Sequence, residues 1–314
     1  MRAPRARHWV SSLAEHHHHD HGEHRHERRS GPALRMAAVI TVAFAVIEAL
    51  GGWWTGSLAL LSDAGHMVTD SASLALAALA AWMARRPPSE RHSYGLGRAE
   101  VVAALLNAAV MLALVAAIAY EAVIRLKAPA PVQGAAAAAI AVLGLALNLW
   151  IMKRLAPHAH DMNTRAARLH VFGDALGSVA ALVSGAVIAF TGWTRIDPVA
   201  SLLICGLIAG SSFRLLRESL HALMEGVPSR LSVEAIGAEM AGVRGVVSVH
   251  DLHVWTLSGT RTALSAHIVV ESLGQWERVL AELQARLLER FDIDHVTLQP
   301  ETATRPLVRH EARH

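Results

Sequence analysis

The chain has 314 residues, of which 53% are hydrophobic and 18% charged, with a mean hydropathy of +0.33. Soluble proteins carry about a quarter charged residues, and uncharged stretches of nearly twenty residues recur here between Met36 and Phe213. This composition excludes an ordinary water-soluble enzyme. The net charge is +3, and the excess basic residues lie beside the apolar stretches. They form no continuous basic stripe, so no nucleic-acid partner is expected. The single cysteine, Cys205, leaves metal sites to histidine and carboxylate ligands.

Six apolar segments are candidate membrane spans, because a helix needs about 20 residues to cross the hydrocarbon core. In chain order they are Met36–Trp54, Ser57–Ala84, Val101–Ile124, Gly134–Met152, Ala166–Phe190 and Pro198–Phe213. The last is short for a full crossing. Basic residues gather on one side of this pattern: Arg25, Arg28, Arg29, Arg35, Arg85, Arg86, Arg91, Arg98, Lys153, Arg154, Arg165, Arg168, Arg214 and Arg217, against Arg125, Lys127 and Arg195 on the other. By the positive-inside rule both termini are cytoplasmic.

The first 34 residues are polar and are expected to be a disordered cytoplasmic segment. They lack the apolar core of a signal peptide, so no cleavage is expected. A histidine-rich tract lies within them, comprising His16, His17, His18, His19, His21, His24 and His26. Such a tract binds metal weakly and without fixed geometry. It either raises the metal concentration near the entrance of the protein or is a dispensable solvated tail.

The hydropathy falls to soluble-domain values after Gly226, and Pro228 marks a linker. We therefore divide the chain into a six-helix transmembrane domain (35–225), a cytoplasmic α+β domain (226–302) and a tail (303–314). Ser232 is a predicted helix N-cap. The elements expected after it are a helix (Val233–Ala241), two strands (Val246–Leu257 and Ala263–Val270), a helix (Trp276–Phe291) and a strand (His295–Gln299). This αββαβ order predicts a small open sheet of ferredoxin-like character.

Two of the predicted spans carry the same pair of ionisable residues. The second contains His66 and Asp70 and the fifth contains His170 and Asp174, so that each histidine precedes an aspartate by four residues. This spacing places both side chains on one helix face. The second span runs inward and the fifth outward, which brings the pairs to roughly the same depth at about 1.5 Å per residue. Two imidazoles and two carboxylates suit tetrahedral Zn²⁺.

A structural explanation stays open for these pairs, because polar residues also hold membrane helices together. Ionisable groups within hydrocarbon are nevertheless costly enough to indicate function. Asp63, one turn before His66, could gate the site, relay protons or cap a kink at Gly65. Glu48 and Asn148 are expected to serve helix packing.

Four ligands in a medium of low polarity would hold Zn²⁺ too tightly for transport unless another cation competes. Histidine titrates near neutral pH, so protonation of His66 or His170 removes a metal-binding lone pair and adds repulsion. The pattern therefore favours exchange of a metal ion for protons.

These motifs resemble the cation diffusion facilitator family, specifically its bacterial zinc-efflux branch. The segment Gly56–Asp70 (GSLALLSDAGHMVTD) is similar to the family signature of the second span, and Leu169–Asp174 (LHVFGD) to that of the fifth. The resemblance extends from about Arg35 to Glu301. It implies a homodimer in the bacterial inner membrane that exports Zn²⁺ from the cytoplasm against protons, by alternating access of one four-ligand site per protomer and without an organic cofactor. Histidine in both pairs resembles the zinc-favouring form, with Co²⁺, Ni²⁺ or Cd²⁺ open as further cargo.

The resemblance also implies a regulatory zinc site in the cytoplasmic domain. We favour His250, His267 and Glu301 as its ligands over His253 and His295. Strand alternation sends His253 to the face opposite His250 unless a bulge intervenes. Surface histidines at a sheet edge are the alternative interpretation.

A second feature implied by the resemblance is an ion pair between the loop after the second span and the end of the sixth. Arg98 falls where relatives place a cation, and Glu225 where they place its acidic partner. If the two residues interlock, charge reversal at Glu225 should impair transport without abolishing binding within the spans.

An intramembrane enzyme is one alternative to transport. Intramembrane hydrolases need a facing carboxylate pair, or a general base beside an open metal position. The spans hold no His-Glu-x-x-His motif and no evident Ser/His pair, so an enzyme is not expected. A membrane-anchored metal sensor is the alternative function, but an anchor has no need of His–Asp pairs inside its spans. The ligands alone do not fix direction; the inward proton gradient and the cytoplasmic histidine tract favour export.

Overall fold

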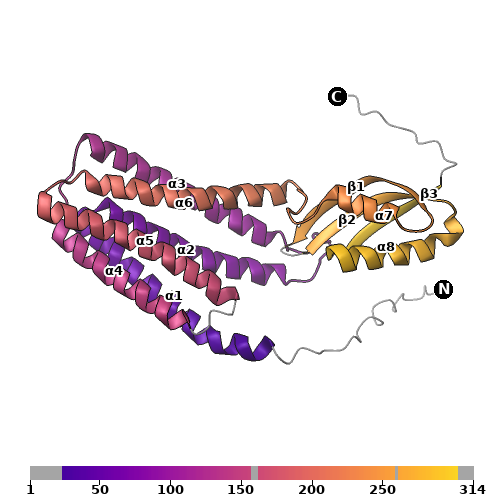
Figure 1. Cartoon of the computed structure of the whole chain (residues 1–314), viewed down its shortest axis with the longest axis horizontal. Coiled ribbons are helices and arrows are strands. Elements are labelled where there is room, and N and C mark those ends of the chain that lie inside the picture. Colours follow the sequence, from indigo (N-terminus) through magenta and orange to yellow (C-terminus); the bar gives the residue numbers. More distant parts are fainter. Residues whose placement is uncertain (1–22, 157–161, 259–260, 303–314) are drawn as a thin grey trace, which may run out of the picture.

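The structure is a computed structural model that describes residues 23–156, 162–258 and 261–302. Its first part consists of six long helices, and its second is a small α+β domain beyond the last of them (Figure 1). The helices are α1 (Glu23–Thr55), α2 (Leu58–Ala84), α3 (Ala99–Lys127), α4 (Gly134–Leu155), α5 (Met162–Thr191) and α6 (Ile196–Leu223). Each contains a segment long and apolar enough to cross a membrane, which confirms the predicted six-helix domain.

Two helices are longer than their apolar segments. α1 begins at Glu23, before the predicted boundary at residue 35, and α6 continues to Leu223, ten residues past Phe213. The added residues include Glu and Arg, which have high helix propensity, so a helix need not stop where its apolar sequence stops. The short sixth span is therefore part of a helix of 28 residues.

The helices pack in two groups. α3 lies against α6, while α1 packs on α2 and α4 packs on α5 (Figure 1). α2 contacts members of both groups, including α5 and α6. Small residues permit close approach between membrane helices: a Cβ atom on Gly134 of α4 would lie 2.7 Å from backbone atoms of Gly185 and Ala189 in α5. This packing positions α2 and α5 side by side.

The first residues of α2 are held by side chains from α3 and α6. Ser57, the N-cap, donates its hydroxyl to the Asp197 carboxylate at 2.6 Å, and the backbone N–H of Leu58 donates to the same carboxylate at 2.6 Å. Arg125 of α3 donates to the carbonyl of Gly56 at 2.6 Å. We call Gly56, Ser57, Arg125 and Asp197 the α2 clamp. It satisfies the free N–H groups at the helix start and joins the two helix groups.

The C-terminal domain has the predicted αββαβ order, which confirms that part of the fold. Its elements are α7 (Val233–Ala241), β1 (Val246–Ser258), β2 (Arg261–Val270), a 3₁₀ turn (Leu273–Gln275), α8 (Trp276–Phe291) and β3 (His295–Thr302). The sheet order is β1-β2-β3, with β1 antiparallel and β3 parallel to β2. Residues from both helices and from the sheet, such as Ile236, Leu264 and Leu283, form one buried core. The other face of the sheet is free of these helices.

A bulge in β1 decides which histidines share that open face. His250 pairs with His267, whereas His253 pairs with Ser265, so three residues of β1 oppose two of β2. Asp251 within the bulge adopts φ 49°, a conformation that Asp tolerates better than most residues. His253 therefore lies on the same face as His250, and simple alternation does not describe this strand.

Candidate functional site

The two predicted His–Asp pairs meet where α2 and α5 adjoin. His66 Nε2 lies 3.7 Å from the Asp70 carboxylate and 4.0 Å from that of Asp174. His170 Nδ1 lies 3.3 Å from Asp70, and its Nε2 lies 3.7 Å from Asp174. Zn–N and Zn–O bonds of about 2.0–2.1 Å require ligand atoms roughly 3.3 Å apart in a tetrahedron. His66, Asp70 and His170 are close enough to share one metal ion, whereas Asp174 lies outside that group, so inward movement of Asp174 is needed to complete a four-ligand site.

The burial of the four side chains is uneven. Asp174 is 0% exposed, and neither of its carboxylate oxygens has a hydrogen-bond partner. His170 is 41% exposed and Asp70 is 22% exposed. Among the residues that the structure describes, the ion pairs of both aspartates are with His66 and His170. A buried carboxylate without donors is costly unless a cation neutralises it, so this cluster is suited to bind one.

A second group of polar side chains lies deeper along α2. Asp63 is 1% exposed and accepts a hydrogen bond from the Ser178 hydroxyl at 3.4 Å, and Ser178 in turn accepts one from the Asn148 amide at 3.4 Å. Glu48 of α1 is also fully buried, and its carboxylate oxygens have no hydrogen-bond partner. A glutamate that only packs helices together would have a donor, so the expected packing role does not account for Glu48.

Sequence reasoning also missed Asp197, which is buried and accepts hydrogen bonds within the α2 clamp. The available signal was an acidic residue at the start of the sixth span, next to Pro198, in a chain whose second span begins with an N-capping serine. Its donors make it a structural carboxylate, in contrast to Asp174.

The open face of the C-terminal sheet holds the other predicted metal ligands. Glu301 accepts hydrogen bonds from His267 Nδ1 at 2.7 Å and from His250 Nε2 at 3.1 Å. The hydrogen bond from His267, and after it the one from His250, lower the pKa of Glu301 below its ordinary value. The three side chains are close enough to hold one metal ion. His253 lies outside this group, and the His295 ring contacts that of Tyr94, with centroids 5.8 Å apart.

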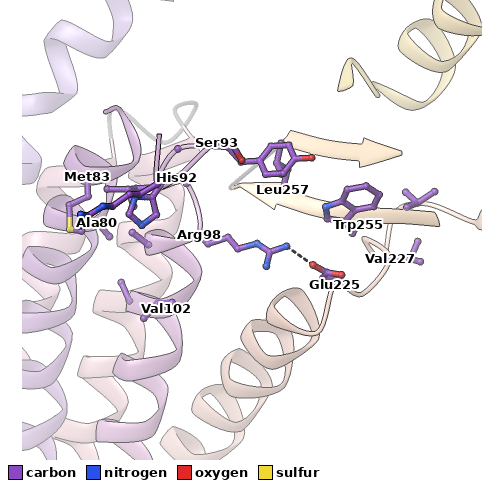
Figure 2. A pocket seen from close by; sticks show the side chains of 18 of the residues that line it. Ala80, Met83, His92, Ser93, Arg98, Val102, Glu225, Val227, Trp255 and Leu257 are labelled. Atoms are coloured by element: carbon purple, nitrogen blue, oxygen red, sulfur yellow. Dashed lines mark hydrogen bonds and ion pairs between the residues drawn. The ribbon is translucent and has the colours of Figure 1, made fainter. Parts of the chain in front are cut away.

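The predicted interlock residues face each other where the two domains meet. Arg98 Nη2 donates to Glu225 Oε1 at 3.1 Å, as Figure 2 shows. The pair borders a cavity of about 1110 Å³ between the ends of α2 and α3 and the sheet, which His253 and Trp255 also line. Both partners are substantially exposed, and such surface pairs contribute about 0–1 kcal/mol.

The histidine tract falls largely outside the described residues. This applies to His16, His17, His18, His19 and His21, while His24 and His26 lie in the first turn of α1.

Comparison with known proteins identifies the family. Residues 34–224 match the model of the cation efflux transmembrane domain, and residues 228–303 match that of the cation efflux protein cytoplasmic domain. "Zinc transporter ZitB" of Pectobacterium atrosepticum is 39% identical over 91% of this chain and 88% of its own length. The "Cadmium, cobalt and zinc/H(+)-K(+) antiporter" of Bacillus subtilis is 36% identical over 90% of this chain and 92% of its own length. "Metal cation efflux system protein CzcD" of Cupriavidus metallidurans is 38% identical over 89% of this chain and 90% of its own length.

These relatives are named as transporters, in agreement with the prediction that the chain is not an enzyme. The matched family models cover the helical part and the α+β domain in turn. The chain therefore belongs to the cation efflux family, also known as the cation diffusion facilitators, and is a multi-pass membrane transporter of metal cations.

Proposed function

We propose that the protein exports Zn²⁺ from the cytoplasm in exchange for protons, with His66, Asp70, His170 and Asp174 as the transport ligands. The observation that carries this proposal is the fully buried Asp174 carboxylate, which lacks hydrogen-bond donors and faces two imidazoles. Two nitrogen and two oxygen ligands favour Zn²⁺, while Co²⁺, Ni²⁺ and Cd²⁺ are secondary candidates.

The division of ligands between two helices suits release as well as binding. α2 and α5 each supply one histidine and one aspartate, so relative movement of the helices changes the distance between the pairs. Protonation of either imidazole removes a metal-binding lone pair. Proton uptake would then favour loss of the metal, which couples the two ions without a further cofactor.

The names of two relatives support the cargo and the exchange. One relative is named a zinc transporter, and the name of another includes zinc and H⁺ antiport. We extend these properties to this chain, with export as the direction, a bacterial inner membrane as the location and both termini in the cytoplasm. The distribution of Lys and Arg in the joints supports that orientation.

We further propose that two copies of the chain assemble through the cytoplasmic domain, and that His250, His267 and Glu301 bind a regulatory zinc ion there. Their close approach on the open face of the sheet supports this site. His253 and His295 lie on the same face but outside the cluster, so they are weaker candidates. Asp63 remains a candidate gate or proton relay, and Arg98 with Glu225 a candidate interlock between the domains.

The central test is zinc flux into inside-out vesicles with an imposed proton gradient. We expect the parent to accumulate zinc and the variants Asp70→Ala and Asp174→Ala to lose accumulation. Glu218→Ala is the matched control, because Glu218 is an exposed carboxylate on α6. Parent-like flux in both site variants would mean that the pairs only pack helices. Zinc binding without flux in the parent would favour the membrane-anchored sensor.

A further inference from the structure

Glu48 of α1 and Asp63 of α2 lie at the same level of the bundle. The two helices run antiparallel across a short turn, and Ala45 of α1 clusters with Met67 of α2. Glu48 follows Ala45 by three residues and Asp63 precedes Met67 by four, so both steps are about one turn in the same direction. The two side chains are 0% and 1% exposed. We call these residues the Glu48–Asp63 pair.

Among the described residues, no ion pair joins either member of the pair to a cation. Asp63 accepts one hydrogen bond, from Ser178 of α5, and Glu48 accepts none among the described residues. Ser178, the donor to Asp63, follows Asp174 by four residues, about one turn of α5, so Asp63 reaches α5 about one turn from the buried Asp174 carboxylate. The carboxylate oxygens of Asp174 and of Glu48 have no hydrogen-bond partner among the described residues. The neighbouring helix α4 contributes the neutral amide of Asn148, through Ser178.

Two carboxylates cannot both remain ionised in such an interior without a cation, because burial and mutual repulsion both disfavour the charged forms. A metal ion would need more ligands than are present. Among the residues that the structure describes, neither Glu48 nor Asp63 belongs to a group of three or more His, Cys, Asp or Glu side chains able to share a metal. A proton needs only one carboxylate oxygen, so it is the cation that fits.

We propose that the Glu48–Asp63 pair is a proton-binding site of the transporter, separate from the four metal ligands and electrostatically linked to them through Asp174. Asp63 lies one turn, about 4.5 Å along the axis, from His66. A divalent ion at the transport site disfavours a proton on this pair, and departure of the ion restores it. The inference rests on the proposed exchange of zinc for protons and supplies a second place where the counter-ion binds.

The direct test is infrared difference spectroscopy of the full-length protein in lipid, which detects the carbonyl band of protonated carboxylic acids. We expect this band at neutral pH in the metal-free parent, its reduction on addition of Zn²⁺, and its loss in part in Glu48→Gln. Glu121→Gln is the control, because Glu121 is partly exposed and paired with Arg125. A band of equal size in the parent and in Glu48→Gln would overturn the proposal.

A transport measurement separates failure of this inference from failure of the proposed function. We expect Glu48→Gln and Asp63→Asn to bind zinc within about 3-fold of the parent affinity, and to lose at least about 10-fold in proton-driven zinc flux. Retained zinc affinity shows that each variant is folded. Parent-like flux in both variants would overturn the role of the pair while leaving the transport ligands intact. Parent-like flux in Asp174→Ala would instead contradict the proposed function, while the infrared result would still decide the protonation of the pair.

Discussion

The two histidine–carboxylate clusters of this protein differ in how their carboxylates are satisfied. Asp174, between α2 and α5, is buried and has no hydrogen-bond donor. Glu301, on the open face of the sheet, is partly exposed and accepts hydrogen bonds from both of its histidines. The membrane cluster therefore needs a cation, whereas the cytoplasmic cluster is already stabilised by its own hydrogen bonds. A metal ion entering the second cluster must displace protons that hold it together.

This difference teaches that similar ligands need not have similar functions. An unsatisfied buried site is held ready for an ion by the surrounding helices, at a cost to stability that the ion removes. A satisfied, exposed site binds an ion only when its concentration outweighs the existing hydrogen bonds. The first arrangement suits obligatory passage of cargo, and the second suits a response to its level.

The largest expected effect is a difference in zinc flux between variants of the two clusters. Asp174→Asn should reduce zinc flux by at least about 100-fold, because even residues that only support a metal ligand cost 10–100-fold when lost. Glu301→Gln should leave flux at saturating zinc within about 3-fold of the parent. Both values come from zinc accumulation in inside-out vesicles at matched protein levels. An equal loss in the two variants would abolish the proposed distinction.

A comparison of Asp197 with Asp174 distinguishes the effect of burial from the effect of lacking hydrogen-bond donors. Asp197 is buried like Asp174, but it accepts hydrogen bonds from Ser57 and Leu58. Asp197→Ala should lower the free energy of unfolding by about 3 kcal/mol, since hydrogen bonds to charged groups contribute about 1.5–3 kcal/mol each. Zinc affinity at the transport site should stay near that of the parent. Thermal unfolding and zinc titration in detergent measure the two quantities. Lost zinc affinity with unchanged stability would contradict this assignment.

The hydrogen bonds of Glu301 predict a pH dependence in the cytoplasmic domain. His267 and then His250 lower the pKa of Glu301 below its ordinary value of 4.5. A carboxyl group whose pKa is lower in the folded state stabilises that state above its unfolded pKa, and the contribution disappears as the pH falls through the folded value. Glu301→Gln should therefore flatten the decline in domain stability below about pH 4.5. Hydrogen exchange of β1 amides in the metal-free full chain measures this, and unchanged steepness in the variant would count against it.

Charge reversal at Glu225 should have a smaller effect. Glu225→Lys replaces the exposed pair with Arg98 by a repulsion between the domains, whereas Glu225→Gln only removes an attraction of about 0–1 kcal/mol. We expect a flux reduction of several-fold for the first variant and little change for the second, with zinc affinity of the transport site unchanged in both. Loss of zinc binding in Glu225→Lys would show that the pair acts on the site itself.

The smallest effect is expected from the histidine-rich tract. Deletion of residues 1–22 leaves α1 intact and should lower zinc flux only when zinc is limiting. Such a tract raises the local zinc concentration and does not change the geometry of the transport ligands. Flux measured across a range of zinc concentrations distinguishes the possibilities. Equal flux at low zinc would identify the segment as dispensable.

Much of the fold was predictable because it depends on local patterns. The lengths of the apolar segments predicted the six spans, and the bounds of α7 and α8 match the predicted helices. The cap at Ser232 was predicted from the sequence alone and accepts the N–H of Ala235. The two His–Asp pairs could be recognised because their spacing matches a helical turn.

The features that escaped prediction depend on contacts between distant segments. The position of Asp197 beside Pro198 marks it as unusual, but it does not indicate that its partner is the start of α2, 139 residues earlier. The bulge at Asp251 requires a backbone conformation that simple alternation does not describe. Glu48 could not be recognised as unpartnered until the helices around it were placed, because the donors available to a buried side chain depend on which helices pack against it.

The α2 clamp has a mechanical consequence for the transport site. Because α2 is fixed at its first residue, a tilt of the helix displaces each later residue in proportion to its distance from Ser57. At about 1.5 Å per residue, Asp70 lies roughly 20 Å along this lever and Ala84 roughly 40 Å. The helix end beside the cytoplasmic domain thus travels about twice as far as the ligands. Small ångström-scale changes in metal geometry are amplified where the two domains meet, and a displacement imposed there is about halved by the time it reaches the ligands.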